Sequence, residues 1–383
     1  MGWPIASVCI FGWALATTYT NHAPLIPVFM EDLGFTPTEA GHLSLAFFLS
    51  MAAGSLPAGV LSDRLGPKQI GGIGLAMACL GTASLGYAEG FVTLLILKVF
   101  GGFGAGLGFI AGVRYATVAF PRSRVHFAQG LYGGSIQLGA GTSLYLMPPL
   151  YERLNLQGAF LVSAAIVLAA LAFWLLVAPD RRMALPPARF SLALRSRTIW
   201  LLALIHTGTF GLAILVGTWI TTFLVRDLGL PLSAAGALGS AVLVVGVLSR
   251  PIGGFIIDRH WVLTKTMIRI SLLAGTSGLV LLALPGRPVW AVLVALLVIG
   301  IALSLPYSAV MNTATAALPE SPGAAVGIVG SVSVVLIALG APALGFVYFQ
   351  TDSFSLAFGL LAGFSFLIFW LARLIRGEED FAK

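Results

Sequence analysis

The chain has 383 residues, of which 58% are hydrophobic and 9% are charged, and it contains 46 glycines. The charges gather between long apolar runs, which is typical of a polytopic membrane protein and excludes an ordinary soluble domain. The net charge of +7 comes without the basic, aromatic surface that nucleic acids require, so no nucleic-acid partner is expected.

Apolar runs of about 20 residues, the length that crosses about 30 Å of hydrocarbon, recur along the whole chain. They predict an all-α membrane protein with twelve transmembrane helices. In chain order, the predicted spans are residues 4–29, 40–62, 69–88, 91–119, 126–149, 156–178, 199–225, 235–257, 267–285, 289–317, 324–349 and 354–375.

Lysine and arginine are concentrated in alternate loops. If the N-terminus is cytoplasmic, the outer loops hold only Arg153, Arg226 and Arg287, and the inner loops and the tail hold the basic residues that lie outside the spans. Because cytoplasmic loops carry the excess of basic residues, both termini are predicted to be cytoplasmic. We expect a monomer in the lipid bilayer of a bacterial-type inner (plasma) membrane.

Two parts of the chain resemble each other. Residues 32–64 and 227–259 align without a gap at an offset of 195, and both begin with Asp-Leu-Gly and end with Asp-Arg. A weaker match places residues 116–123 over residues 314–321 at an offset of 198. Because equivalent positions are six spans apart, the sequence predicts two parallel, pseudo-symmetric halves of six helices each.

The predicted halves are residues 1–178 and 199–383. Between them, residues 179–198 are polar and arginine-rich and contain Pro186-Pro187, so they are expected to form a cytoplasmic linker. Its second part, "ARFSLALRSR", is predicted to be a short basic helix at the membrane interface.

The segment "GVLSDRLGPK", residues 59–68, matches the Gly-x-x-x-Asp-Arg-x-Gly-x-Lys/Arg signature between helices two and three of the major facilitator superfamily. A degenerate copy, "GFIIDRH", lies where that family repeats the signature. The chain therefore resembles this family of transporters, which implies the major facilitator fold. The resemblance also implies gating and structural roles at the inner face for Gly59, Asp63, Arg64, Gly66, Lys68, Asp258 and Arg259.

The charges inside the predicted spans are all basic. Every acidic residue falls in a predicted loop, at a helix end or in the tail, whereas Lys98, Arg114 and Arg250 lie within spans. Carriers of organic cations, and many proton-coupled sugar or drug carriers, use a buried Asp or Glu to hold the cation or the proton. The distribution of charge therefore favours an anionic solute.

Arg250 is the strongest candidate for contact with that solute. It precedes Asp258 by eight residues, which places it about 12 Å inside the cytoplasmic end of its helix and close to the midplane. The adjacent Pro251 removes a backbone donor and favours a kink. An arginine suits a planar oxyanion because its donors can form two parallel hydrogen bonds.

Further polar residues in the spans can complete such a site. His22 and His206 are the residues there that titrate near neutral pH, which makes protons a candidate coupling ion. The predicted set of substrate-binding residues is Arg250, Ser55, Lys98, Tyr19, His22, Gln137, His206, Tyr307 and Asn312.

The segments "FPRSRVHFAQGLYGGSIQLG" and "SRPIGGFIIDR" resemble the nitrate/nitrite porter group of the superfamily. In that group, arginines of helices two and eight clamp the anion. Arg250 corresponds to the helix-eight arginine, whereas Ser55 occupies the equivalent repeat position and "GLGFIAG" lacks the group's asparagine. The resemblance implies a secondary transporter of a small monovalent anion, working by alternating access through exchange or proton-linked transport.

Oxalate/formate and monocarboxylate carriers, which share an Arg-Pro-type helix eight, give the alternative of an organic anion transporter. A drug efflux carrier and a transport-dead receptor are the remaining alternatives. The sequence has no Gly-x-Ser-x-Gly, phosphate-binding loop or HExxH motif, so neither an enzyme nor a cofactor or metal is expected.

Overall fold

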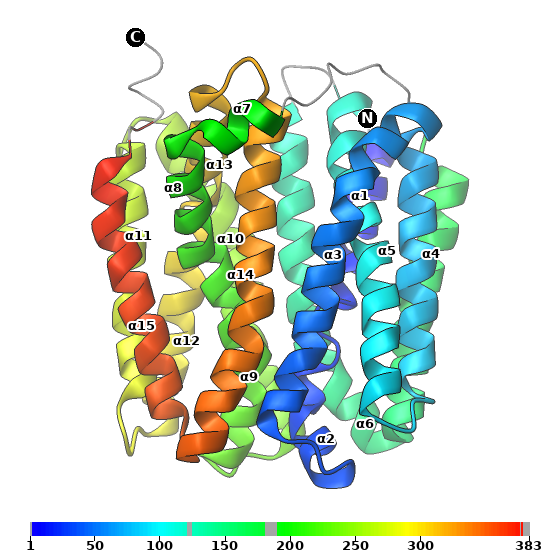
Figure 1. Ribbon diagram of the computed structural model, residues 1–383, viewed down its shortest axis with the longest axis vertical. Helices are drawn as coiled ribbons and strands as arrows, with labels where there is room; N and C mark the ends of the chain where they lie inside the picture. The colour runs from blue at the N-terminus through cyan, green and yellow to red at the C-terminus, as the bar shows by residue number, and fades with distance from the viewer. Residues whose placement is uncertain (1, 121–124, 181–189, 376, 378–383) are drawn as a thin grey trace. The chain divides into compact units, whose positions relative to one another are not determined.

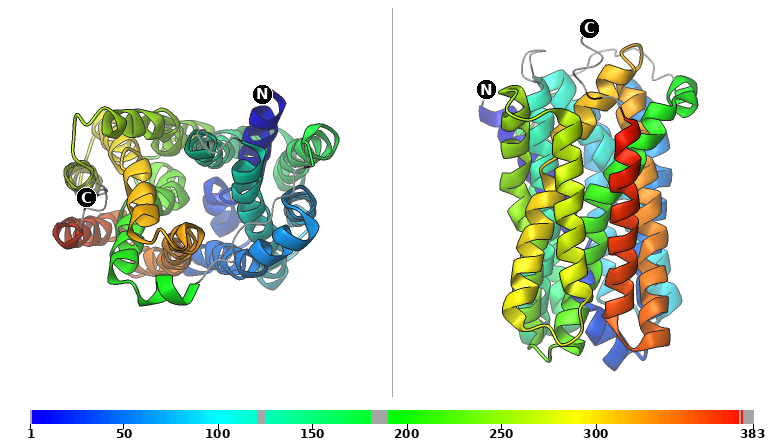
Figure 2. Two further views of the ribbon diagram at one scale, coloured as in Figure 1. Left: turned by 90° about the horizontal axis from the view of Figure 1, so that it is seen from above. Right: turned by 90° about the vertical axis from the view of Figure 1, so that its left-hand side faces the viewer.

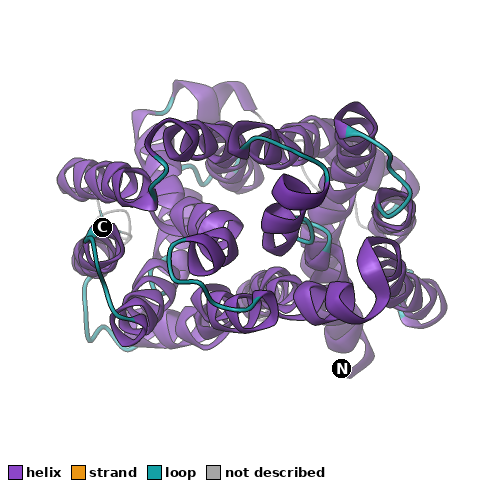
Figure 3. Ribbon diagram, turned by 90° about the horizontal axis from the view of Figure 1, so that it is seen from below, coloured by secondary structure: helices purple, strands orange, loops and turns teal. Residues whose placement is uncertain are grey.

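The computed structural model describes residues 2–120, 125–180, 190–375 and 377, and within these ranges it consists of helices joined by short loops (Figures 1 and 3). All twelve predicted spans are helical over most of their length. The elements are α1 (Gly2–Thr17), η1 (Ala23–Leu25), α2 (Ile26–Asp32), α3 (Pro37–Leu65), α4 (Pro67–Leu85), α5 (Phe91–Ala119), α6 (Val125–Val177), α7 (Phe190–Arg195), α8 (Arg197–His206), the π-helical segment η3 (Thr207–Gly211), α9 (Leu212–Arg226), α10 (Leu232–Asp258), α11 (Thr264–Ala283), α12 (Val289–Ser304), α13 (Tyr307–Ala317), α14 (Pro322–Thr351), α15 (Phe354–Leu371) and η4 (Ala372–Leu374).

Nine helical stretches in the described ranges are long and apolar enough to cross a membrane. One of them, residues 130–177, is 48 residues long and accounts for two predicted spans. Asn155 interrupts it with φ 60° and ψ −175°, and its side-chain oxygen accepts from the N–H of Gly158 at 3.1 Å. The prediction of an all-helical membrane protein is confirmed.

The first predicted span, residues 4–29, is not one continuous helix. Residues 18–22 form turns between α1 and η1. The hydroxyls of Thr17 and Thr18 each donate to a carbonyl three residues back at 2.7 Å, and Pro24 has no N–H to continue a helical ladder. Hydropathy does not reveal this break because the residues around it stay mostly apolar.

The internal repeat is visible in the helix boundaries. The helices α3 and α10 begin at Pro37 and Leu232, at the predicted offset of 195, and each contains a proline. Residues 91–119 form the single helix α5, whereas the equivalent residues 289–317 form two helices, α12 and α13. The break falls next to Pro306, so the two copies differ in backbone structure at this point.

The chain forms two compact units. The first unit comprises Met1–Leu185, Gly217–Ser240 and Ala341–Phe346, and the second comprises Pro186–Val216, Ala241–Gly340 and Val347–Lys383. The first unit thus includes parts of α9, α10 and α14, where the indole N–H of Trp219 donates to the carbonyl of Ala341 at 3.1 Å. The predicted halves, 1–178 and 199–383, remain a prediction.

Glycines let α3 and α5 pack closely within the first unit. A Cβ atom at Gly102 would collide with the carbonyl oxygen of Phe47, and one at Gly106 with that of Met51. The two backbones therefore approach as in small-residue contacts of other membrane helices.

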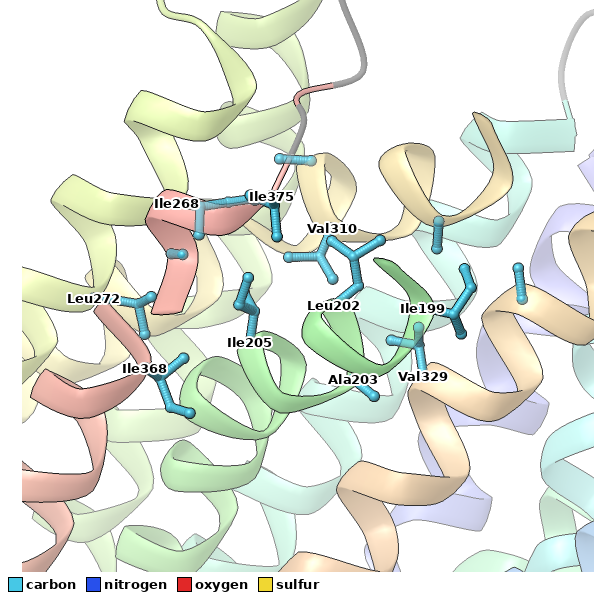
Figure 4. Close-up of a cluster of buried hydrophobic side chains, with 14 of the residues drawn as sticks. Ile199, Leu202, Ala203, Ile205, Ile268, Leu272, Val310, Val329, Ile368 and Ile375 are labelled. Atoms are coloured by element: carbon cyan, nitrogen blue, oxygen red, sulfur yellow. The ribbon is translucent and has the colours of Figure 1, made fainter. Parts of the chain in front are cut away.

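In the second unit, an apolar cluster holds α8 against its neighbours. Ile205 of α8, Leu272 of α11 and Ile368 of α15 belong to it (Figure 4). The helices α11 and α15 run side by side (Figures 1 and 2) and are also joined by the Thr276 to Ser365 hydroxyl bond at 2.9 Å. This packing fixes the position of His206, which follows Ile205 in the chain.

The helix α7 matches part of the predicted basic interfacial helix, and it lies across the end of α8 (Figure 1). The indole of Trp200 donates to the carbonyl of Leu194 at 2.8 Å and ties the two helices together. Residues 181–189 of the predicted linker lie outside the described ranges.

Replacing Gly106 with Leu is expected to destabilise the protein by about 1–3 kcal/mol or more, because the new side chain must displace the α3 backbone. Gly363→Leu is the matched control, since nothing lies within 4 Å of a Cβ at that exposed position. Thermal unfolding of the purified variants in detergent measures the difference. Equal melting temperatures for the two variants would contradict the close packing of α3 on α5.

Candidate functional site

Arg250 lies in the interior of α10, eight residues before its last residue. Its side chain is 4% exposed. The guanidinium carbon lies 4.2 Å from the ring centroid of Tyr307 and 5.5 Å from that of Phe210. Because the face of an aromatic ring is electronegative, these two rings stabilise the buried cation and orient it.

Both rings come from irregular parts of membrane-spanning helices. Phe210 belongs to the π-helical segment η3, which interrupts the span formed by α8 and α9. Tyr307 is the first residue of α13, directly after the break at Pro306. Short π-helical segments and broken membrane helices are both frequent at functional sites.

The start of α13 also approaches α10 itself. A Cβ atom at Gly253 would collide with the carbonyl oxygen of Leu305, and one at Gly254 would lie 3.1 Å from the hydroxyl oxygen of Ser308. The N-terminus of α13 is therefore about one turn from Arg250 along α10. The first N–H groups of a helix have no partner within it and favour negative charge, so two sources of positive potential lie close together.

His206 completes this cluster. It is the last residue of α8 and is 4% exposed. Its ring stacks on Phe210 with a centroid distance of 5.3 Å and an interplanar angle of 11°, and it lies 6.0 Å from the ring centroid of Tyr307. The structure thus brings the predicted residues Arg250, His206 and Tyr307 together in the second unit.

Phe210 was missing from the predicted site. The sequence signal that could have found it is its spacing of four residues from His206, which places both on one face of a helix. Asn312, predicted to contact substrate, lies half-buried further along α13.

A second buried cation lies in the first unit. Lys98 of α5 is 2% exposed, and its ammonium donates to the side-chain oxygen of Asn21 at 2.6 Å. The same ammonium lies 5.3 Å from the ring centroid of Phe47. The amide nitrogen of Asn21 in turn donates to the hydroxyl of Thr82 at 3.4 Å. Lys98 is therefore stabilised by a network of neutral groups rather than by a carboxylate.

Tyr19 and His22 flank this network in the turn that follows α1. His22 Nε2 and the hydroxyl of Ser44 are hydrogen-bonded at 2.7 Å. The ring of Tyr19 packs against Phe47 and Phe48 at 5.6 and 6.3 Å, and its hydroxyl has no hydrogen-bond partner among the described residues. The sequence placed Tyr19 and His22 in a helix, whereas the turn around them depends on the proline and threonine residues described above.

The other predicted residues of the first unit have different surroundings. The hydroxyl of Ser55 donates to the carbonyl of Met51 at 2.8 Å and lies 3.5 Å from that of Gly106, so it lies where α3 packs on α5. Gln137 is 1% exposed on α6.

The "GVLSDRLGPK" signature forms the tight turn between α3 and α4. Gly66 has φ 97°, a conformation that side chains disfavour, which explains the glycine at this position. Asp63 forms a 3.1 Å ion pair with Arg114 of α5, and the carbonyl of Lys68 accepts from the indole of Trp174 at 2.9 Å. The sequence did not predict the Arg114 contact, which joins residues 51 positions apart.

The remaining residues of the two signature copies make fewer contacts. Gly59 has no neighbour within 4 Å of a Cβ position, and Arg64 is exposed. In the second copy the guanidinium of Arg259 packs 5.1 Å from the Phe255 ring centroid. The side chain of Asp258 lies outside the described part of the structure.

The buried charges of the described residues are basic. Lys98, Arg250 and Arg287 are buried, whereas no described carboxylate is. Arg287 lies between α11 and α12, where it donates to the carbonyl of Leu284 and to the hydroxyl of Ser355. The buried charges of the described residues are therefore all positive.

Comparisons with known proteins agree with this architecture. The family model described as "Major Facilitator Superfamily" matches residues 8–341. The probable nitrate/nitrite antiporter NarK1 of Thermus thermophilus is 24% identical over 78% of this chain and 74% of its own length. The probable nitrate transporter NarT of Staphylococcus haemolyticus is 26% identical over 91% of this chain and 90% of its own length.

Among solved structures, a bacterial homologue of the human lysosomal transporter Spinster, in an inward-facing and occupied conformation, has a similar fold. The TM-score is 0.77 at 15% identity, covering 97% of this chain and 95% of that one. This similarity concerns the fold alone.

Lys98→Met is expected to lower the free energy of unfolding by about 1–3 kcal/mol, because it leaves the buried Asn21 carbonyl without its donor. The double variant Lys98→Met/Asn21→Leu removes both groups and should recover most of that loss. Thermal unfolding of the two variants measures the difference. A double variant less stable than the single one would show that the hydrogen bond is not what stabilises this pair.

Proposed function

This chain belongs to the Major Facilitator Superfamily and is a secondary transporter rather than an enzyme, and we propose that it moves a small monovalent anion of the nitrate or nitrite type across the membrane. The transport is by alternating access, in which the anion-binding residues are exposed to one side of the membrane at a time. The membrane is of the bacterial inner type, with both termini in the cytoplasm, and the protein acts as a monomer.

The observation that carries this proposal is the position of Arg250. A guanidinium that is 4% exposed in the interior of a membrane helix is costly to maintain, and such residues generally serve a function. The aromatic faces of Tyr307 and Phe210 hold it in place. A planar oxyanion can accept two parallel hydrogen bonds from a guanidinium fixed in this way.

The amount of positive charge favours a monovalent substrate. Arg250 supplies one full charge, and the N-terminus of α13 adds a partial one. No described carboxylate is buried, so an organic cation would find no counter-charge. A divalent anion would keep uncompensated charge in surroundings of low dielectric constant, whereas a monovalent anion is matched.

The relatives support the same class of substrate. The two compared above carry names that refer to nitrate or nitrite. A short monocarboxylate is the alternative, because a carboxylate has the same charge and the same planar arrangement of two oxygens. Only the shape of the site can then distinguish nitrate or nitrite from a short monocarboxylate. Transport measured with a series of labelled anions shows which of them the protein accepts.

The buried charge also constrains the transport cycle. Arg250 is the proposed contact of the anion, so its surroundings change when the anion arrives or leaves. Either a second anion must therefore bind before the protein returns to its other conformation, as in exchange, or a second ion must be transported together with the anion.

Arg250→Ala is expected to weaken nitrate binding by about 30-fold or more, because a buried charge contact of this kind contributes about 2 kcal/mol or more. Arg250→Lys should also impair binding by about tenfold, since a point charge cannot form two parallel hydrogen bonds. Counterflow of labelled nitrate in proteoliposomes, together with equilibrium binding, measures both effects.

Arg287→Lys is the matched control, because it makes the same exchange at another buried arginine and should leave nitrate counterflow near the wild-type rate. Wild-type counterflow by the Arg250→Ala variant would refute the assignment of the site. Counterflow of short monocarboxylates but not of nitrate or nitrite would favour the alternative substrate.

A further inference from the structure

We infer that His206 binds a proton together with the anion, so that the protein transports one proton with each anion. The imidazole gains a proton when the anion binds beside Arg250 and loses it when the anion leaves. This inference rests on the proposed function and assigns the residue that carries the proton.

The geometry places His206 in the electrostatic environment of Arg250. Both side chains contact the same two rings, Phe210 and Tyr307, at centroid distances between 4.2 and 6.0 Å. Nδ1 of His206 is buried without a hydrogen-bond partner among the described residues. The imidazole therefore has a nitrogen that can take up a proton, and its ring shares two aromatic neighbours with the guanidinium of Arg250.

The charged and titratable groups around His206 come from several elements. Arg250 belongs to α10 and Tyr307 to α13, whereas α12 and α15 contain no titratable residue. The one in α14, Tyr348, stacks on Phe354 in the last turn of that helix. The remaining groups lie at the ends of the packed elements, namely Arg195, Arg197, Arg226, Asp258, Lys265, Arg269 and Arg373.

While the site is empty, a second positive charge on the imidazole next to Arg250 would be unfavourable. A bound anion reverses the local field. Its negative charge offsets that of the guanidinium, and its oxygen can accept a hydrogen bond from a protonated imidazole. The anion therefore increases the affinity of His206 for a proton, and by linkage the proton increases the affinity for the anion.

The charge balance follows directly. One proton comes from water on the side of entry and returns to water on the side of release, together with one monovalent anion. The solutes carry no net charge across the membrane, and the site has the same net charge when it is empty and when it is loaded.

His22 is the other buried histidine of the described chain, and its surroundings differ. Its Nδ1 also has no hydrogen-bond partner among the described residues, but its Nε2 is hydrogen-bonded to Ser44 at 2.7 Å, and the nearby Lys98 is held by Asn21. His206 instead shares its ring contacts with the arginine proposed to bind the anion. The structure therefore favours His206 as the proton site.

The experiment counts protons during binding. Nitrate is added to purified, wild-type protein in weakly buffered solution with a pH-sensitive dye, at several pH values between about 5 and 8. We expect uptake that approaches one proton for each nitrate bound, and a nitrate affinity that falls by up to about tenfold per pH unit as the pH rises through the same interval. His206→Gln should bind nitrate without proton uptake and with an affinity that no longer depends on pH.

His42→Gln is the matched control, since this histidine packs on Phe91 near the start of α3 and should keep the wild-type proton uptake. Nitrogen NMR of the wild-type protein with labelled histidines gives a second measurement. One imidazole should become protonated when nitrate is added, and this measurement does not depend on how well the His206 variant folds.

The outcomes separate the two proposals. A wild-type protein that binds no small anion would refute the proposed function. Nitrate binding without proton uptake at any pH, without a protonated imidazole in the NMR spectrum, or with uptake lost in His22→Gln instead of His206→Gln, would overturn the inference and leave the proposed function in place.

Discussion

The contact of Arg250 with the faces of Tyr307 and Phe210, at 4.2 and 5.5 Å, is the interaction on which the proposed activity of this protein depends. A buried positive charge within a membrane helix is unfavourable unless its surroundings compensate for it. Here the electronegative faces of the two rings stabilise the guanidinium that we propose to bind the anion.

This arrangement requires irregular helices. Residues 289–317 form two helices with a break at Pro306, and the start of α13 lies against α10. The π-helical segment Thr207–Gly211 follows His206 and presents Phe210 to the guanidinium. Such irregularities are tolerated only where they are enclosed by protein or line a polar space.

The two repeats stabilise their buried cations in different ways. Lys98 is neutralised in part by the carbonyl dipole of Asn21 at 2.6 Å, whereas Arg250 packs between rings. At the position equivalent to Arg250 in the repeat, Ser55 donates to the backbone instead. The duplicated fold thus provides similar helices, and the side chains make the two units chemically different.

The fold could be predicted from sequence because hydropathy and the spacing of basic residues depend on local composition. The twelve spans, the repeat and the buried position of Arg250 all followed from such patterns. The turn that contains Tyr19 and His22, the break at Pro306 and the π-helical segment could not be predicted in the same way, since they change the backbone hydrogen bonds without changing hydropathy.

Contacts between residues far apart in the chain also could not be predicted from the sequence. The pairing of Asp63 with Arg114 and that of Lys98 with Asn21 join residues 51 and 77 positions apart. They exist only once the helices have packed. Without them, the sequence could indicate which residues are polar and within the membrane, but not which of them already have partners.

The most direct test of the central claim is a thermal-stability screen of the purified wild-type protein against different classes of solute. A ligand at about 100 times its dissociation constant stabilises the folded state by about 2.7 kcal/mol, which raises the unfolding temperature measurably. We expect stabilisation by nitrate, nitrite or a short monocarboxylate, and none by organic cations or hexoses. Stabilisation by an organic cation or a hexose, and by none of the small anions, would contradict it.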